Sequence, residues 1–228
     1  MTNGGHKVVL QANDFTELKK IPFLREVIVL SYIMNAVRSS QRFLLLTDED
    51  SNGPAKTRDT IFGLITTSSL TYEGMKTAAG VLKQLAPSLS KELHGDVAWV
   101  ISEERNTNSL LNTTLERIRN RIAFHFNLQI GDDILKEAVY GYPPVFEEGS
   151  SSRTIDSVYV LADEVITQLF AQRDPSWETP QDKVVGLLQQ LSQYNVRLCE
   201  ILDKVIAHII SDRAEGFVEA NCAQHPAP

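Results

Sequence analysis

The sequence predicts an all-α protein, a helical bundle whose first and last helices are long. Two stretches, residues 21–46 and 57–85, carry apolar side chains at near-helical spacing, and after Pro22 the first of them contains neither glycine nor proline. Near the other end of the chain, apolar residues alternate in steps of four and three, the pattern of helices packed along their length. Hydrophobic residues make up 43% of the chain and charged residues 22%, as in an ordinary folded domain.

Turn chemistry separates the first two predicted helices. Pro22 fits the first turn of the helix over 21–46, and residues 48–54, Asp-Glu-Asp-Ser-Asn-Gly-Pro, predict a polar loop. The second helix, over 57–85, ends before Pro87. The short apolar run Val97–Ile101 fits a strand or a buried turn, because periodicity cannot assign so short a run. We interpret it as a connector.

Three further helices are expected before the last one. Asn106–Ser109 supplies capping residues ahead of Leu110, so a helix should run from there to about Asn127. A short helix is predicted over 132–140, then a loop over 141–152 and a helix over 155–171.

The last predicted helix covers residues 181–211. It carries Asn195 within a series of apolar residues in steps of four and three, namely Val184, Leu188, Leu191, Leu198, Leu202, Val205 and Ile209. Three more apolar residues, each one position before a member of that series, widen the stripe: Leu187, Tyr194 and Ile201. A stripe of this width favours a buried bundle helix over an isolated two-stranded coil.

Length and composition predict one helical domain over residues 1–217 and a flexible C-terminal tail over 218–228. The end of the chain is small, polar and proline-containing, which is typical of fraying. The net charge of -7 and the pI near 5.3 argue against broad adhesion to nucleic acid or to an anionic membrane. Any phosphate partner must therefore be met by a local basic patch.

The cysteines and the apolar stretches favour a cytoplasmic protein that is not membrane-bound. Cys199 and Cys222 cannot form a disulfide framework, which fits a reducing compartment. Residues 1–7 lack the pattern of a signal peptide. The most apolar stretch, residues 27–37, is too short and too closely bounded by charge to span a bilayer.

The most informative stretch is residues 117–126, Arg-Ile-Arg-Asn-Arg-Ile-Ala-Phe-His-Phe, which places basic and titratable residues on an otherwise apolar helix. At about 100° per residue, Arg117, Arg121 and His125 form a ladder along one flank of the helix. Arg119 lies on the other flank, about 120° from His125 by the same arithmetic. Between them runs a predicted core stripe made of Leu111, Leu115, Ile118 and Ile122.

Arginine and histidine together suit the chemistry of phosphate. A histidine exchanges a proton near neutral pH, and an arginine fork binds phosphate oxygens and stabilises charge that builds on phosphorus. The pair is sufficient for RNA cleavage by the RNA's own 2′-hydroxyl, without a metal. Arg117 and Arg121 are then candidate phosphate-binding residues.

Residues 119–125, Arg-Asn-Arg-Ile-Ala-Phe-His, resemble the motif of the HEPN superfamily (higher eukaryote and prokaryote nucleotide-binding domains), an arginine and a polar residue followed by a histidine. Members are compact helical bundles, and many are metal-independent endoribonucleases or inactive relatives of these. The resemblance implies Arg119 and His125 as the catalytic pair and Asn120 as the assisting polar residue. It also implies a homodimer in which two motifs meet, and RNA as a partner.

A second interpretation makes the protein a non-catalytic helical interaction or scaffold protein with a protein partner. The three arginines would then pair with carboxylates of adjacent helices, and His125 would be a satisfied interior residue. Arg121 could also replace Arg119 as the functional arginine. The two interpretations predict different surroundings, since catalysis needs Arg119 and His125 accessible, whereas a structural network needs them enclosed beside Asp or Glu.

We predict no metal and no cofactor. Asp156, Asp163 and Glu164 share one face of a predicted helix, but a solvated acidic face explains them better than a metal site. The sequence has no glycine-rich phosphate loop, nucleophile elbow or HExxH motif, so the common nucleotide-hydrolase, esterase and zinc-protease functions lack support.

Overall fold

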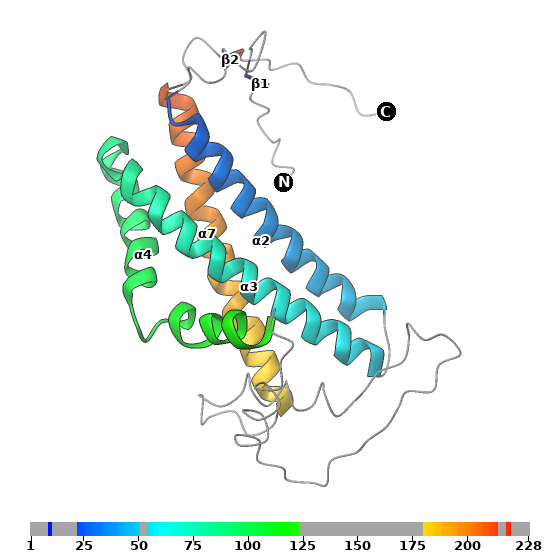
Figure 1. The fold of residues 1–228 in the computed structure, drawn as a ribbon. Coiled ribbons are helices and arrows are strands. Elements are labelled where there is room, and N and C mark those ends of the chain that lie inside the picture. The colour runs from blue at the N-terminus through cyan, green and yellow to red at the C-terminus, as the bar shows by residue number, and fades with distance from the viewer. Residues whose placement is uncertain (1–8, 11–21, 51–53, 124–179, 214–217, 220–228) are drawn as a thin grey trace, which may run out of the picture.

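The computed structural model describes residues 9–10, 22–50, 54–123, 180–213 and 218–219. Within these ranges the protein is a helical bundle, which confirms the predicted fold class (Figure 1). The predicted helices over 132–140 and 155–171, the loop over 141–152 and residues 220–228 of the predicted tail lie outside the described residues.

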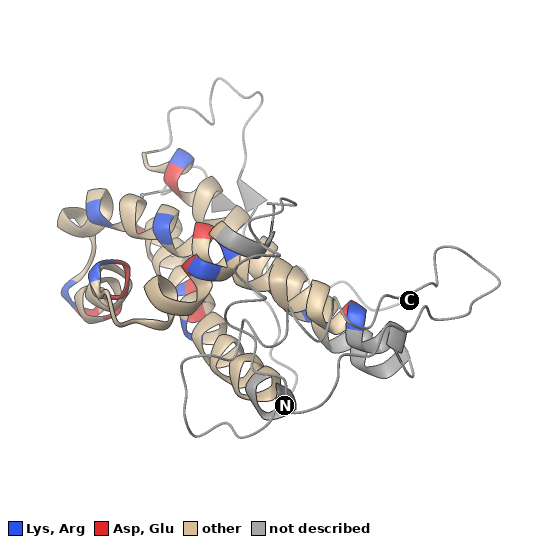
Figure 2. Cartoon of the chain, turned by 60° about the horizontal axis from the view of Figure 1, so that its bottom comes forward, with Lys and Arg blue, Asp and Glu red and all other residues tan. Residues whose placement is uncertain are grey.

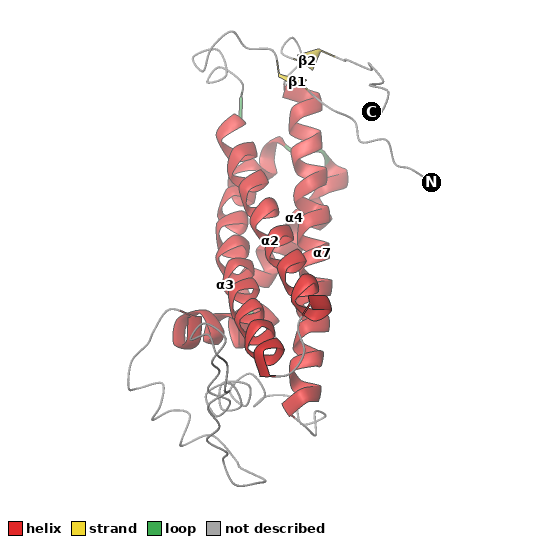
Figure 3. Ribbon diagram, turned by 90° about the vertical axis from the view of Figure 1, so that its right-hand side faces the viewer, coloured by secondary structure: helices red, strands yellow, loops and turns green. Residues whose placement is uncertain are grey.

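Three long helices form the body of the bundle. Helix α2 (Leu24–Asp50) and helix α3 (Pro54–Leu85) lie side by side, and helix α7 (Pro180–Arg213) packs along both of them (Figures 1 and 3). Two 3-10 turns, η1 (Ala86–Ser88) and η2 (Lys91–Leu93), lead from α3 into helix α4 (His94–Arg105). Two short strands, β1 (Val9–Leu10) and β2 (Val218–Glu219), pair antiparallel, Val9 opposite Glu219. The long first and last helices that the sequence predicts are therefore present.

The core consists of the apolar faces that these helices turn toward one another. The predicted apolar series of α7 is largely buried, including Leu191, Leu198, Leu202, Val205 and Ile209, while Val184 and Leu188 are half-buried. The three residues that widen the stripe, Leu187, Tyr194 and Ile201, are also buried. This width confirms a bundle helix, because α7 meets α2 and α3 at once.

A polar layer interrupts the core between α3 and α7. Thr67, Thr71 and Asn195 are each 0% exposed. The Thr71 hydroxyl oxygen lies 2.8 Å from the carbonyl oxygen of Thr67 and 2.8 Å from Oδ1 of Asn195. Because the contact between Thr71 and Asn195 joins two fully buried polar side chains, it favours the register in which this turn of α3 faces Asn195.

The start of α2 differs from the prediction. The helix begins at Leu24 and not at Ile21, and Pro22 lies in the turn before it. Phe23 has a positive φ of 61°, which a right-handed helix cannot accommodate, so the helix starts after it. The carbonyl oxygen of Phe23 accepts the Val27 N–H at 3.0 Å, which is the first hydrogen bond leading into the helix. The helices also extend into the predicted loop over 48–54, as α2 ends at Asp50 and Pro54 is the first residue of α3.

The connector predicted at Val97–Ile101 is wrong, because these residues lie within helix α4. Val97 and Val100, three residues apart, are the buried positions of α4, and the helix packs against α3. Asp96 in its first turn favours a helix start at this point. So short a helix needs only two buried residues, which is too few to distinguish helix from strand by periodicity.

Two glycines of α3 give a matched pair of stability predictions. A Cβ at Gly74 would lie 2.8 Å from Cγ2 of Ile33, a buried and stiff side chain, whereas a Cβ at Gly80 would meet nothing within 4 Å. We expect Gly80→Ala to raise the free energy of unfolding by about 0.5–1 kcal/mol. Gly74→Ala should lower it by about 1–3 kcal/mol through overpacking. Urea denaturation of both variants tests this, and stabilisation by both would contradict close packing of α2 on α3 at Gly74.

Candidate functional site

The helix that carries the motif begins where the sequence predicts. Ser109 precedes Leu110, and its hydroxyl oxygen accepts the Asn112 N–H at 3.3 Å, as expected of a capping residue. The Asn112 side chain also donates to the carbonyl oxygens of Glu104 at 2.9 Å and of Asn106 at 3.0 Å. These bonds join the start of the helix to the end of α4.

Much of this helix is π-helical, which the sequence does not predict. Segment η3 (Leu111–Leu115) and segment η4 (Ile118–Ala123) are both π-helical, and the Glu116 N–H donates to the carbonyl of Leu111, five residues back. Because a π turn holds more residues than an α turn, the predicted angles at 100° per residue do not carry over to these segments. Three of the four residues of the predicted core stripe, Leu111, Leu115 and Ile118, are nonetheless buried, and the side chain of the fourth, Ile122, lies outside the described residues.

Arg119 lies at the surface of the helix, in contact with α3. Its Nε forms an ion pair with Oε1 of Glu73, and its Nη1 donates to Oδ1 of Asn120 at 2.9 Å. The Arg119 side chain is 40% exposed and that of Glu73 is 52% exposed. Exposed ion pairs contribute about 0–1 kcal/mol to stability, so Glu73 can be displaced from the guanidinium at little cost.

Charges of both signs surround this pair along α3. Lys76 lies 3.7 Å and Lys83 lies 3.1 Å from carboxylate oxygens of Glu104 in α4, and the Lys83 hydrogen bond lowers the pKa of Glu104. Burial, followed by the charge and the hydrogen bond of Glu116, raises the pKa of Tyr72 beside Glu73. Figure 2 shows basic and acidic residues interspersed on the described helices. Among the residues that the structure describes, Arg119 is thus part of a surface of mixed charge and not of a broad basic patch.

The structure brings together only some of the predicted site residues. Arg119 and Asn120 are hydrogen-bonded to each other, and Asn120 is exposed. Arg117 is half-buried and interacts with a neighbouring group. Arg121 belongs to η4, but its side chain lies outside the described residues, as do His125 and the acidic residues Asp156, Asp163 and Glu164. Among the residues described, no three His, Cys, Asp or Glu side chains gather as a metal site.

Sequence reasoning missed Glu73, the partner of Arg119. The two residues are separated by 46 positions and lie on different helices, so no local spacing connects them. The only signal was the general expectation that carboxylates of adjacent helices would meet the arginines.

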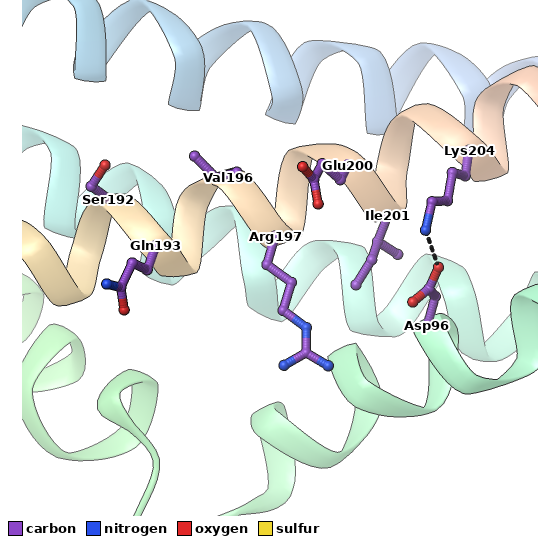
Figure 4. Close-up of a pocket in the computed structure, with 8 residues that line it drawn as sticks. All are labelled: Asp96, Ser192, Gln193, Val196, Arg197, Glu200, Ile201 and Lys204. Atoms are coloured by element: carbon purple, nitrogen blue, oxygen red, sulfur yellow. Dashed lines mark hydrogen bonds and ion pairs between the residues drawn. The ribbon is translucent and has the colours of Figure 1, made fainter.

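Sequence reasoning also missed an open groove between α4 and α7 (Figure 4). On one side Lys204 donates to Asp96 at 2.8 Å, and the guanidinium of Arg197 lies 4.2 Å from the ring centroid of Trp99. The groove is lined by two basic residues, Arg197 and Lys204, and two acidic residues, Asp96 and Glu200, so their charges cancel. The groove therefore does not favour an anion.

Fold and site together define a helical-bundle protein with an arginine–asparagine pair held at its surface. A scan against models of protein families found no match, and neither did searches of curated proteins and of solved structures. No helix in the described part of the chain combines the length and the apolar character needed to cross a membrane.

Proposed function

We propose that this is a HEPN-like, RNA-directed protein that acts as a metal-independent endoribonuclease. Its guanidinium donor is Arg119, with Asn120 as the assisting polar residue and His125 as the acid–base group. The observation that supports this is the placement of Arg119, whose side chain is 40% exposed and is held by Asn120 at the surface. A phosphate can reach a guanidinium in this position and take its remaining N–H donors in two-point geometry.

In the proposed reaction the RNA supplies its own nucleophile. The 2′-oxygen forms a bond to the adjacent phosphorus while the bond from phosphorus to the 5′-oxygen breaks, leaving a cyclic phosphate and a 5′-hydroxyl. His125 takes the proton of the 2′-hydroxyl while water protonates the departing 5′-oxygen, or His125 protonates the 5′-oxygen while water accepts the proton of the 2′-hydroxyl. Arg119 stabilises the negative charge that builds on the phosphoryl oxygens. Arg117 and Arg121 are proposed to hold neighbouring phosphates.

We further propose that the protein works in the cytoplasm as a homodimer. The resemblance to the HEPN superfamily implies that two copies of the motif meet, which would place an arginine of one subunit near the histidine of the other. The acidic net charge of -7 leaves RNA binding to this local site.

A second candidate function rests on the ion pair between Arg119 and Glu73. A carboxylate of an adjacent helix within bonding distance is what a structural network needs. In this case the motif would tether its helix to α3 in a non-catalytic interaction or scaffold protein. Both candidates use the same contact, so they are separated by what happens when Glu73 loses its charge.

Glu73→Gln separates the two candidates. Its carboxylate competes with phosphate for the guanidinium, and one unit charge at about 4 Å in water is worth about 1 kcal/mol. The RNA-directed function therefore predicts that Glu73→Gln binds labelled RNA about 3- to 5-fold more tightly than the wild type in EDTA, measured by fluorescence anisotropy. Glu200→Gln, which removes the same charge from an exposed position of α7, should leave the affinity unchanged. If the wild type neither binds nor cleaves any member of a broad RNA panel, the RNA-directed function is wrong.

A further inference from the structure

Two exposed phenylalanines lie against each other where α2 and α3 meet. Phe43 in α2 is 44% exposed and Phe62 in α3 is 60% exposed. Their ring centroids are 6.4 Å apart and the ring planes meet at 81°, an edge-to-face contact. Burying a phenylalanine is worth about 1.5–3 kcal/mol, so two such rings at the surface suggest a ligand that covers them. We refer to Phe43 and Phe62 as the aromatic pair.

Arginines flank the aromatic pair on both helices. Arg42 precedes Phe43, is exposed, and forms no ion pair with any residue that the structure describes. On α3, Arg58 lies one turn before Phe62 and forms an ion pair with Asp59 at 3.0 Å, which neutralises that carboxylate. Aromatic faces beside arginines are the combination that proteins use to bind unpaired nucleotides.

The aromatic pair lies on the same side of α3 as the Arg119 site. Phe62 and Glu73 are 11 residues apart on one α-helix, which corresponds to about 16 Å along the axis and about 20° around it. At about 3.4 Å per stacked nucleotide, this separation spans roughly five nucleotides.

We propose that the aromatic pair and Arg42 form a binding subsite for single-stranded RNA, which holds the strand that Arg119 contacts. One or two bases stack on the exposed ring faces, and Arg42 binds a phosphate beside them. The subsite selects single-stranded RNA because a base that is paired and stacked in a duplex cannot offer its face to a side chain. This inference rests on the proposed function, since it names the form of RNA that the Arg119 site takes.

The test is the affinity of the full-length protein for a labelled, unstructured RNA in EDTA, measured by fluorescence anisotropy. Stacking on one aromatic side chain is worth about 1–3 kcal/mol, so Phe62→Ala should weaken binding by about 5- to 150-fold. Phe62→Tyr keeps a ring face and should bind like the wild type. Tyr32→Ala removes another aromatic residue of α2, 75% exposed and outside the pair, and should also leave the affinity unchanged.

Arg42→Gln gives a second measurement that does not alter the rings. We expect a loss of a few-fold in affinity and a fall of about 1 in the salt slope of binding. The subsite is overturned if Arg119→Ala weakens RNA binding while Phe62→Ala and Arg42→Gln do not, or if a matched RNA duplex competes as well as the single strand. Absence of RNA binding by the wild type is a different result, which overturns the proposed function together with the subsite.

Discussion

Arg119→Ala is expected to slow RNA cleavage by about 10²- to 10³-fold while the protein stays folded, because this is the usual effect of removing one donor from a charge-stabilising site. The Arg119 side chain is 40% exposed and that of its partner Glu73 is 52% exposed, so loss of Arg119 should change the free energy of unfolding by less than about 1 kcal/mol. The measurement is kcat/KM on a labelled RNA in EDTA, with urea denaturation of the same preparations.

The matched control is Arg197→Ala, which removes another exposed arginine, in α7, from outside the motif. It should cleave RNA at the wild-type rate. Arg119→Lys keeps the charge but loses the planar fork, so its rate should lie between those of the wild type and Arg119→Ala. Equal activity of Arg119→Ala and the wild type would exclude Arg119 from the site and would leave Arg121 as the functional arginine.

Leu198→Ala should lower the free energy of unfolding by about 2–5 kcal/mol, the range found for truncation of a fully buried leucine. Leu198 is 0% exposed and belongs to the face that α7 turns toward the core. Truncation there removes buried methyl groups and leaves a cavity that neighbouring helices fill only in part.

Val196→Ala, two residues away on the same helix, is the matched control. Val196 is 49% exposed, and a surface truncation of this kind usually changes stability by less than about 0.5 kcal/mol. The urea midpoints of the two variants measure this difference in stability. Similar losses from both would mean that α7 does not present this face to α2 and α3.

The sequence predicts the long helices well because their buried faces repeat over many turns. In α7 the spacing of Leu191, Leu198, Leu202 and Val205 identifies the face that the structure buries. Burial of a continuous stripe is a property of the sequence period, and it needs no knowledge of the neighbouring helices.

Features that depend on a second segment could not be predicted. Helix α4 buries only Val97 and Val100, so its apolar pattern is too short to identify it as a helix. Its packing against α3 is what the sequence pattern does not contain. The π-helical turns of η3 and η4 leave no mark in apolar spacing, since Leu111, Leu115 and Ile118 are buried just as an α-helix would require.

The candidate site shows the same division. Arg119 and Asn120 are adjacent in sequence, and their hydrogen bond at 2.9 Å follows from that proximity. Glu73 and the aromatic pair come from α2 and α3, and only the packing of the bundle places them beside the motif or on its side of α3.

Incubation of the wild-type protein with labelled single-stranded RNA in EDTA is the most direct test of the central claim, that the Arg119, Asn120 and His125 motif cleaves RNA without a metal. The account predicts cleavage that His125→Ala loses by about 10²- to 10⁴-fold. It also predicts no cleavage at a position where the 2′-hydroxyl is replaced by hydrogen. Intact RNA after incubation across a broad panel, or cleavage that continues at the deoxy position, would contradict it.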